Sequence, residues 1–197
     1  YRLSRSSGQF RYIIGYVAKM KRRDSSTFIS MAEAAGAPGN RKRGLFLAGA
    51  AYVPSDTALT GAVNYIVPEV LNILYAETNY TWIVNQDLQL KLSAQFTDQR
   101  SVSKELLGSF DTRVVGSRAA LSYKNAIVTT AFSATASKAS IRSPFGTYAG
   151  YLSLMEKDFN RAGESAWLMG FSYDWQRLGI PGLSFTVNYA RGYGARD

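Results

Sequence analysis

Polar and apolar residues alternate along much of this sequence, and this period of two constrains the fold more than any other feature. The longest example covers residues 87–99, where Leu88, Leu90, Leu92, Ala94 and Phe96 alternate with Gln89, Lys91, Ser93, Gln95, Thr97 and Gln99. Successive side chains of a β-strand point to opposite faces, so the pattern predicts strands with one apolar and one polar face. Clear or weaker versions of it occupy 10–20, 45–54, 58–68, 70–83, 112–123, 126–137, 166–175 and 183–189. The chain is therefore expected to be all-β and antiparallel, with about nine strands.

The links between these strands alternate in length. Short links at 54–57, 85–87, 124–125 and 178–182 are separated by longer segments at 22–44, 100–111 and 138–165, and the link 67–70 is short where a long one is due. Most strands have about the 9–11 residues that a tilted strand needs to cross a bilayer. Tyr80, Trp82 and Trp175 stand beside short links, as aromatic residues do at a membrane interface. Residues 1–197 are therefore predicted to form a single partial domain of an up-and-down transmembrane β-barrel.

The composition excludes several classes of protein. The chain has no Cys and no His, so it offers no disulfide, no thiolate metal site and no Ser-His-Asp triad. The longest apolar run, 45–53, is shorter than the roughly 18 residues of a membrane-spanning helix. The glycines at 146, 150 and 163 lack the spacing of a phosphate-binding loop. We predict no enzyme activity, no cofactor and no metal.

Two other functions fit part of the pattern. A soluble β-barrel that holds a small ligand would show the same alternation, because periodicity does not distinguish a protein core from lipid. A net charge of +9 suggests a nucleic-acid partner, but such a protein needs aromatic residues and cations on the same face. On the clearest strands they take opposite faces, so we expect no nucleic-acid partner.

Several segments resemble the OprD-type outer-membrane porins, and they occur in the same order and spacing. They are 15–24 (GYVAKMKRRD), 30–36 (SMAEAAG), 95–102 (QFTDQRSV), 143–146 (SPFG), 150–153 (GYLS), 158–164 (DFNRAGE), 166–167 (AW), 172–174 (SYD) and 178–179 (LG). The resemblance implies a barrel of about 18 strands in the outer membrane of a Gram-negative bacterium, as a monomer or a loose homotrimer. It implies uptake of small carboxylates, such as amino acids or related acids, through a lumen lined by Arg and Lys. The chain would then be a middle-to-later part of such a barrel, without its first strands and its closing strand.

Four basic residues fall on the predicted polar faces: Arg11, Lys19, Lys91 and Arg118. The guanidinium group of Arg can hydrogen-bond both oxygens of a carboxylate. Several such groups, none of them too strong, let an anion move from site to site. We therefore predict that these four residues form a lumenal basic ladder, with Glu77 as an acidic partner on the same face. The simpler alternative is that they balance acidic residues in a wide polar interior.

The segment 138–165 is too long for a turn, and long loops are usually functional or disordered. Its turn-forming residues and charges suggest that it folds inward, and by resemblance it is a constriction loop of the family. The residues predicted to line the constriction are Arg142, Ser143, Pro144, Phe145, Gly146, Asp158 and Arg161. A plain surface loop is the alternative.

Two basic clusters, 21–23 and 41–43, flank the segment 22–44. They are expected near the outer leaflet, where outer-membrane lipid and the phosphates of lipopolysaccharide would be natural partners. Residues 31–35 are expected to form a short helical turn. A solvated loop without a binding role explains the same residues.

Overall fold

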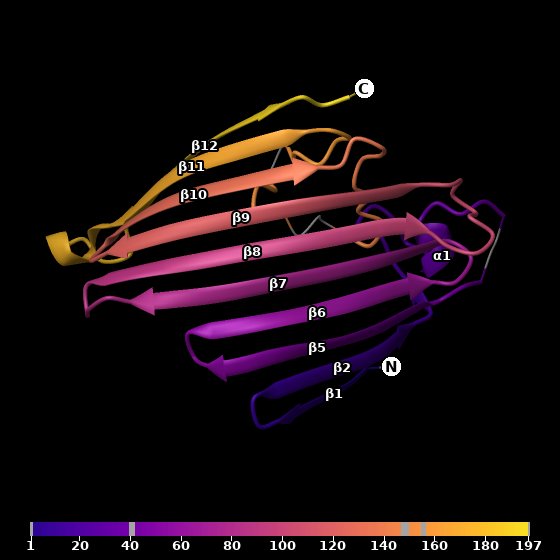
Figure 1. The fold of residues 1–197 in the computed structure, drawn as a ribbon, viewed down its shortest axis with the longest axis horizontal. Helices are drawn as coiled ribbons and strands as arrows, with labels where there is room; N and C mark the ends of the chain where they lie inside the picture. Colours follow the sequence, from indigo (N-terminus) through magenta and orange to yellow (C-terminus); the bar gives the residue numbers. More distant parts are fainter. Residues whose placement is uncertain (1, 40–41, 147–149, 155–156, 197) are drawn as a thin grey trace.

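The fold is dominated by one large open sheet of antiparallel strands (Figure 1), beside a small two-stranded sheet. The structure, a computed structural model, describes residues 2–39, 42–146, 150–154 and 157–196. Within these residues, ten strands form the sheet and follow one another in chain order. They are β1 (Arg2–Ser7), β2 (Phe10–Val17), β5 (Leu45–Ser55), β6 (Ala58–Val67), β7 (Leu71–Ile83), β8 (Leu88–Ser101), β9 (Asp111–Tyr123), β10 (Ala126–Thr135), β11 (Ser165–Asp174) and β12 (Ser184–Tyr193). The expected all-β, up-and-down architecture is confirmed, with β1 and β12 at the two open edges.

The register places the alternating residues on two different faces. Glu77 lies opposite Gln95, and Ser93 lies opposite Arg118, so these side chains share what we call the polar face. The other side, which we call the apolar face, leaves large side chains exposed. Among them are Tyr80, Trp82, Leu92, Leu121, Phe132, Phe171 and Tyr189. An exposed apolar surface of this extent marks a face that contacts a membrane or another protein.

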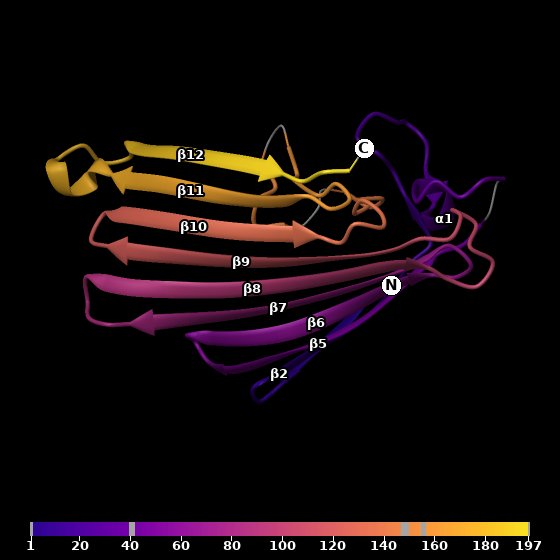
Figure 2. The ribbon, with the colours of Figure 1, turned by 45° about the horizontal axis from the view of Figure 1, so that its top comes forward.

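The connections at one end of the sheet are short and those at the other end are mostly long. Figure 2 shows the short turns at the left and the long connections, with α1 (Met31–Ala34), at the right. The longer connections are 18–44, 102–110 and 136–164, and the expected tight link 68–70 lies at the same end. At the short-turn end, β11 is followed by a 3₁₀ helix, η1 (Trp175–Leu178). None of the helices in the described residues is long and apolar enough to cross a membrane.

The N-terminal part differs from the expectation in two ways. The strand β1, which the alternation did not indicate, pairs with β2 through a turn in which Gly8 adopts a φ of 55°, a conformation that favours glycine. The alternation predicts that Lys19 extends the polar face of β2, but it does not. Pairing between β2 and β5 ends at Val17 and Leu45, so the backbone beyond Val17 has no partner in the sheet. Lys19 lies instead in β3 (Lys19–Met20), which pairs with β4 (Ile29–Ser30).

The long connections at the α1 end share a small hydrophobic core. The expected helical turn is present as α1, and the side chain of Ser30 caps it by accepting a hydrogen bond from the Glu33 backbone. Two residues of α1 belong to a hydrophobic cluster that also draws on the following loop, on β5, and on the β6–β7 link with the strand residues that flank it. Its members are Met31, Ala32, Ala37, Leu45, Val67, Val70 and Leu71. Leu106, Leu107 and Phe145 from two other loops pack against this cluster. The loops at this end of the sheet therefore pack against one another through a shared hydrophobic core.

Candidate functional site

A series of cations lies along the polar face, and neighbouring cations share cavities. Arg11 on β2 and Lys91 on β8 both line a cavity of about 310 Å³ that also includes Asp56. Lys91 and Arg118 line a second cavity of about 150 Å³. In the register, Arg11, Lys91 and Arg118 lie on the same face of the sheet, whereas Lys19 lies outside this series.

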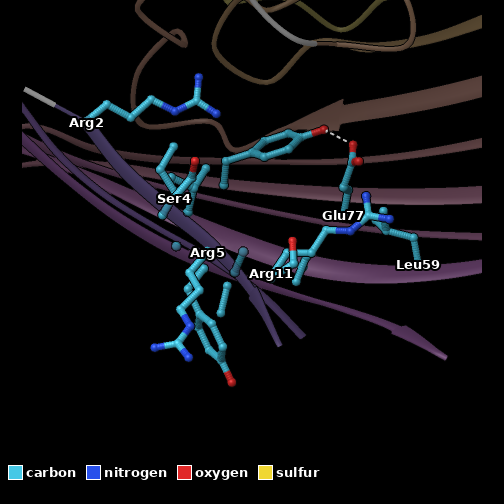
Figure 3. A pocket seen from close by; sticks show the side chains of 16 residues that line it. Arg2, Ser4, Arg5, Arg11, Leu59 and Glu77 are labelled. Carbon is cyan, nitrogen blue, oxygen red and sulfur yellow. Dashed lines mark hydrogen bonds between the residues drawn. The ribbon is translucent and has the colours of Figure 1, made fainter. Parts of the chain in front are cut away.

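Arg11 also borders the largest of these spaces, a cavity of about 500 Å³ near the β1 edge. Figure 3 shows Arg2, Arg11 and Glu77 on one side of the sheet, and Arg5 on the other. In the register, the row that joins Arg11 to Glu77 passes through Ala51 and Gly61. Both are small, so no large side chain fills the space between the cation and the carboxylate.

Glu77 lies on the polar face, as predicted, but its contacts differ from the expected pairing with an arginine. Its carboxylate accepts a hydrogen bond from Tyr75 Oη at 2.6 Å and one from Asn79 Nδ2 at 3.4 Å. Asn79 in turn accepts a hydrogen bond from Ser93 Oγ at 2.7 Å. In the described part of the chain, no cation forms an ion pair with Glu77. The carboxyl group of Glu77 is therefore held by neutral donors beside the cationic series.

The connection 136–164 folds onto the polar face instead of extending away from the sheet. The side-chain amide of Gln99 on β8 forms two hydrogen bonds with the backbone of Arg142. Gln99 Nε2 donates to the carbonyl oxygen of Arg142 at 2.8 Å, and the backbone N–H of Arg142 donates to Gln99 Oε1 at 2.8 Å. Thr112 on β9 donates a hydrogen bond to the carbonyl oxygen of Ala139. Tyr151 lines the same cavity as Lys91 and Arg118. These contacts place the described part of the segment over the polar face.

Apolar contacts and an ion pair made by a buried carboxylate hold the second half of this connection. Leu152 and Phe159 are buried with Ala131, Ala166 and Leu168 of the sheet. Glu164 is fully buried and pairs with Arg161 at 2.8 Å. Burial alone would raise the pKa of Glu164, but hydrogen bonds from the side chain and backbone of Arg161 outweigh it and the pKa lies below its ordinary value. The lowered pKa favours the ionised form of Glu164, which pairs with Arg161 directly before β11.

The predicted constriction residues fall into two groups. Those of the first half line a cavity of about 460 Å³ on the polar face, together with Tyr65, Ile73, Tyr75 and Thr97; they are Arg142, Ser143, Pro144, Phe145 and Gly146. The guanidinium of Arg142 also lies 3.9 Å from the centre of the Phe110 ring. Asp158 and Arg161 hold the segment itself, because Asp158 accepts a hydrogen bond from Ser153 and Arg161 pairs with Glu164. Residues 147–149 and 155–156 lie outside the described residues.

Three residues of the site were missed by the sequence reasoning. Arg2 borders the Arg11 cavity, but β1 has polar residues on both faces and gives no alternation signal. Gln99 was assigned to the polar face without any indication that it binds a segment 43 residues away. Tyr151 lines the cavity of Lys91 and Arg118, a position for which the sequence gives no signal. Among the described residues, no group of three or more acidic side chains could hold a metal ion.

Comparison with known proteins identifies the family. The family described as outer membrane porin, OprD family, matches residues 6–197. This chain belongs to the OprD family. It is therefore part of an outer-membrane β-barrel, in which the apolar face meets lipid and the polar face lines the lumen. No curated protein sequence matches it.

Solved structures of porins from Pseudomonas aeruginosa share the fold of this OprD-family chain. OccK9 (OpdG) is 18% identical, with a TM-score of 0.89 over 100% of this chain and 51% of its own. OpdK, in a crystal structure with vanillate, is 18% identical, with a TM-score of 0.87 over 100% of this chain and 52% of its own. OccK2 (OpdF), in complex with glucuronate, is 16% identical, with a TM-score of 0.86 over 97% of this chain and 52% of its own. The chain thus spans about half the length of these porins, which agrees with an open sheet.

Proposed function

We propose that the porin containing this chain conducts small water-soluble carboxylates, such as amino acids or related acids, across the outer membrane. The observation that carries the proposal is the cationic series on the polar face, in which Arg11, Lys91 and Arg118 are linked by shared cavities. Arg2 extends this series toward the β1 edge. A carboxylate leaving one cation meets the next within the same cavity.

The neighbouring groups fit transient binding. The guanidinium groups of Arg11 and Arg118 can each hold both oxygens of a carboxylate. Glu77 stands across the small-residue row from Arg11, where it opposes tight anion binding and offers an acceptor to the ammonium group of an amino acid. Binding at several weak sites supports flux, whereas one strong site would stop it. Vanillate and glucuronate, named in the OpdK and OccK2 structures, are both carboxylates.

The constriction in this proposal is the segment 138–165. Arg142 to Gly146 bring a cation, two turn residues and an aromatic ring over the polar face beside Tyr75 and Thr97. The segment narrows the lumen there and brings the Arg142 end close to the path of the solute. Its hydrogen bonds to Gln99 fix its height above β8.

Single-channel conductance of the full-length porin in a planar bilayer tests the proposal. Glucuronate and glucose form a matched pair, because they differ in the carboxylate at one carbon. We expect discrete conductance steps that glucuronate interrupts transiently and glucose does not. Steps that respond equally to both solutes would indicate a general diffusion pore, and folded protein without conductance would rule out transport.

A further inference from the structure

The outer side of the barrel wall carries a charged cluster at the end with the long connections. Asp98 and Arg100 are on β8, and Arg113 on β9 lies directly opposite Asp98 in the register. All three belong to the apolar face, since Leu92 and Phe96 precede them on the same side of β8 and Val115 follows on β9. None of them therefore points toward the lumenal series described above.

The geometry of this cluster leaves hydrogen-bond donors available. Arg100 Nε donates to Asp98 Oδ1 at 2.7 Å, and Arg113 Nε donates to Oδ2 at 2.8 Å. The Asp98 side chain is only 9% exposed, whereas those of Arg100 and Arg113 are 50% and 61% exposed. A guanidinium has five N–H donors, so most of the donors of Arg113 remain for another acceptor. The buried carboxylate orients two outward-facing cations.

The cluster stands at the outer limit of the apolar surface. From Leu88 to Asp98 the strand rises by ten residue steps, which is about 34 Å at roughly 3.4 Å per step. A tilt of about 45° reduces this to about 24 Å of depth. The apolar band of such barrels is about 25 Å tall. Because long loops mark the outer surface of these barrels, the two arginines lie at the level of the outer-leaflet headgroups.

We propose that Arg100 and Arg113 bind a phosphate group of lipopolysaccharide in the outer leaflet. Two guanidinium groups over one carboxylate leave one net positive charge beside the membrane, and the adjacent pair of Lys138 and Asp111 is balanced. Guanidinium groups match phosphate oxygens in charge and in geometry. Phe96 and Val115, directly below on the same face, offer an apolar surface for the acyl chains of the same molecule.

This site differs from the basic clusters that the sequence pointed to. Arg22 donates a hydrogen bond to the carbonyl oxygen of Ala34 at 2.8 Å. Arg43 pairs with Glu69 at 3.1 Å, and Arg41 lies outside the described residues. These cations hold loops together, whereas Arg100 and Arg113 project from the wall of the barrel into the membrane boundary.

The test measures binding of purified lipid A to the full-length porin in detergent by microscale thermophoresis. The probes are bisphosphorylated lipid A and the same lipid with both phosphates removed. We expect wild-type protein to bind the phosphorylated form at least tenfold more tightly. Arg113→Gln, which leaves Asp98 paired with Arg100, should remove most of that preference, and Arg113→Lys should retain part of it. The matched control is Arg177→Gln, an exposed ion-paired arginine at the short-turn end.

Each outcome decides the proposal. Equal affinity of the wild type for the two lipids would overturn it without any variant, as would an unchanged preference in Arg113→Gln. A variant that keeps its lipid preference but changes its oligomeric state would assign the cluster to a protein–protein contact, which also overturns the proposal. Loss of the preference in Arg113→Gln but not in Arg177→Gln supports it.

Discussion

Arg118 projects from β9 into the cavity that it shares with Lys91 and Tyr151. Hydrogen bonds to charged groups contribute about 1.5–3 kcal/mol, and about 1.4 kcal/mol corresponds to a factor of ten in binding. Arg118→Gln should therefore weaken block of the conductance by glucuronate by about tenfold. Arg118→Lys keeps the charge but loses the bidentate geometry, so its effect should be smaller. Arg177→Gln at the short-turn end should leave the block unchanged, and an equal loss in that control would contradict a lumenal role for Arg118.

Glu69, in the link between β6 and β7, connects three loops through its carboxylate. Lys104 Nζ lies 3.0 Å from Oε1, and Arg43 Nη2 lies 3.1 Å from Oε2. Hydrogen bonds from Lys104 and Arg43 lower the pKa of Glu69 from its ordinary value of 4.5. A carboxyl with a lower pKa in the folded state stabilises that state above its unfolded pKa, and the stabilisation is lost as the pH falls through the folded pKa. The contacts between these loops should thus be intact at neutral pH and weaken below pH 4.5.

Spin labels on the loops measure this effect. Labels at Lys42→Cys and Ser109→Cys in the cysteine-free chain should give a narrow distance distribution at neutral pH that broadens in acid. Glu69→Gln should give the broad distribution at both values, because it cannot carry the charge. A label pair at Gln86 and Gln176, at the short-turn end, controls for general acid unfolding. A narrow distribution in Glu69→Gln would show that the ion pairs do not hold the loops.

At the scale of the element, the sequence predicts most strands well but not where they end. The interior strands are confirmed to within a few residues, because a polar lumen on one face and lipid on the other impose the alternation. The alternation fails as a signal where the hydropathy pattern and the strand pairing do not coincide. Alternation continues to Met20, although β2 loses its partner after Val17. In β1, the serines and arginines carry no polarity difference between faces.

Loop contacts are harder to predict than strands, because they depend on residues far apart in the chain. The hydrogen bonds between Gln99 and Arg142 join two distant segments, and no local sequence pattern predicts them. The same applies to Tyr151, whose position beside Lys91 and Arg118 follows from the course of the whole connection 136–164. The sequence indicated that this segment folds inward, whereas the side chains that hold it there required the structure.

Leu152 tests whether the connection 136–164 narrows the lumen. Its side chain is buried against the sheet at 1% exposure, and truncation of such a leucine typically costs about 2–5 kcal/mol. Because the strand ladders are unaffected, Leu152→Ala should release the connection while the barrel still assembles. We expect larger conductance steps and weaker discrimination between glucuronate and glucose. Leu178→Ala, an exposed leucine on η1, is the control, and wild-type conductance in Leu152→Ala would contradict the constriction.

At the scale of the whole molecule, the two faces of the sheet determine which side meets lipid. Alternation alone is equally compatible with an apolar core, as in a soluble barrel. The structure leaves the apolar face exposed along the sheet and folds the connection 136–164 onto the polar face. The OprD family then assigns these faces to lipid and lumen. Sequence periodicity predicted the two faces, and family membership identifies what surrounds each of them.

Two adjacent threonines on β10 test this sidedness. Thr129 faces the lumen between Ala120 and Gly170, and Thr130 faces lipid between Ala119 and Met169. A positive charge on the lipid side near the bilayer centre costs about 2–4 kcal/mol, whereas a lumenal charge remains hydrated. Thr130→Arg should therefore lower the free energy of unfolding in urea titrations of the full-length porin in phospholipid vesicles. Thr129→Arg should fold with near wild-type stability and change the conductance, because small neighbours leave it room. The reverse pattern, with Thr129→Arg destabilised and Thr130→Arg stable, would contradict this assignment, because it would show that the face of Thr129 contacts lipid.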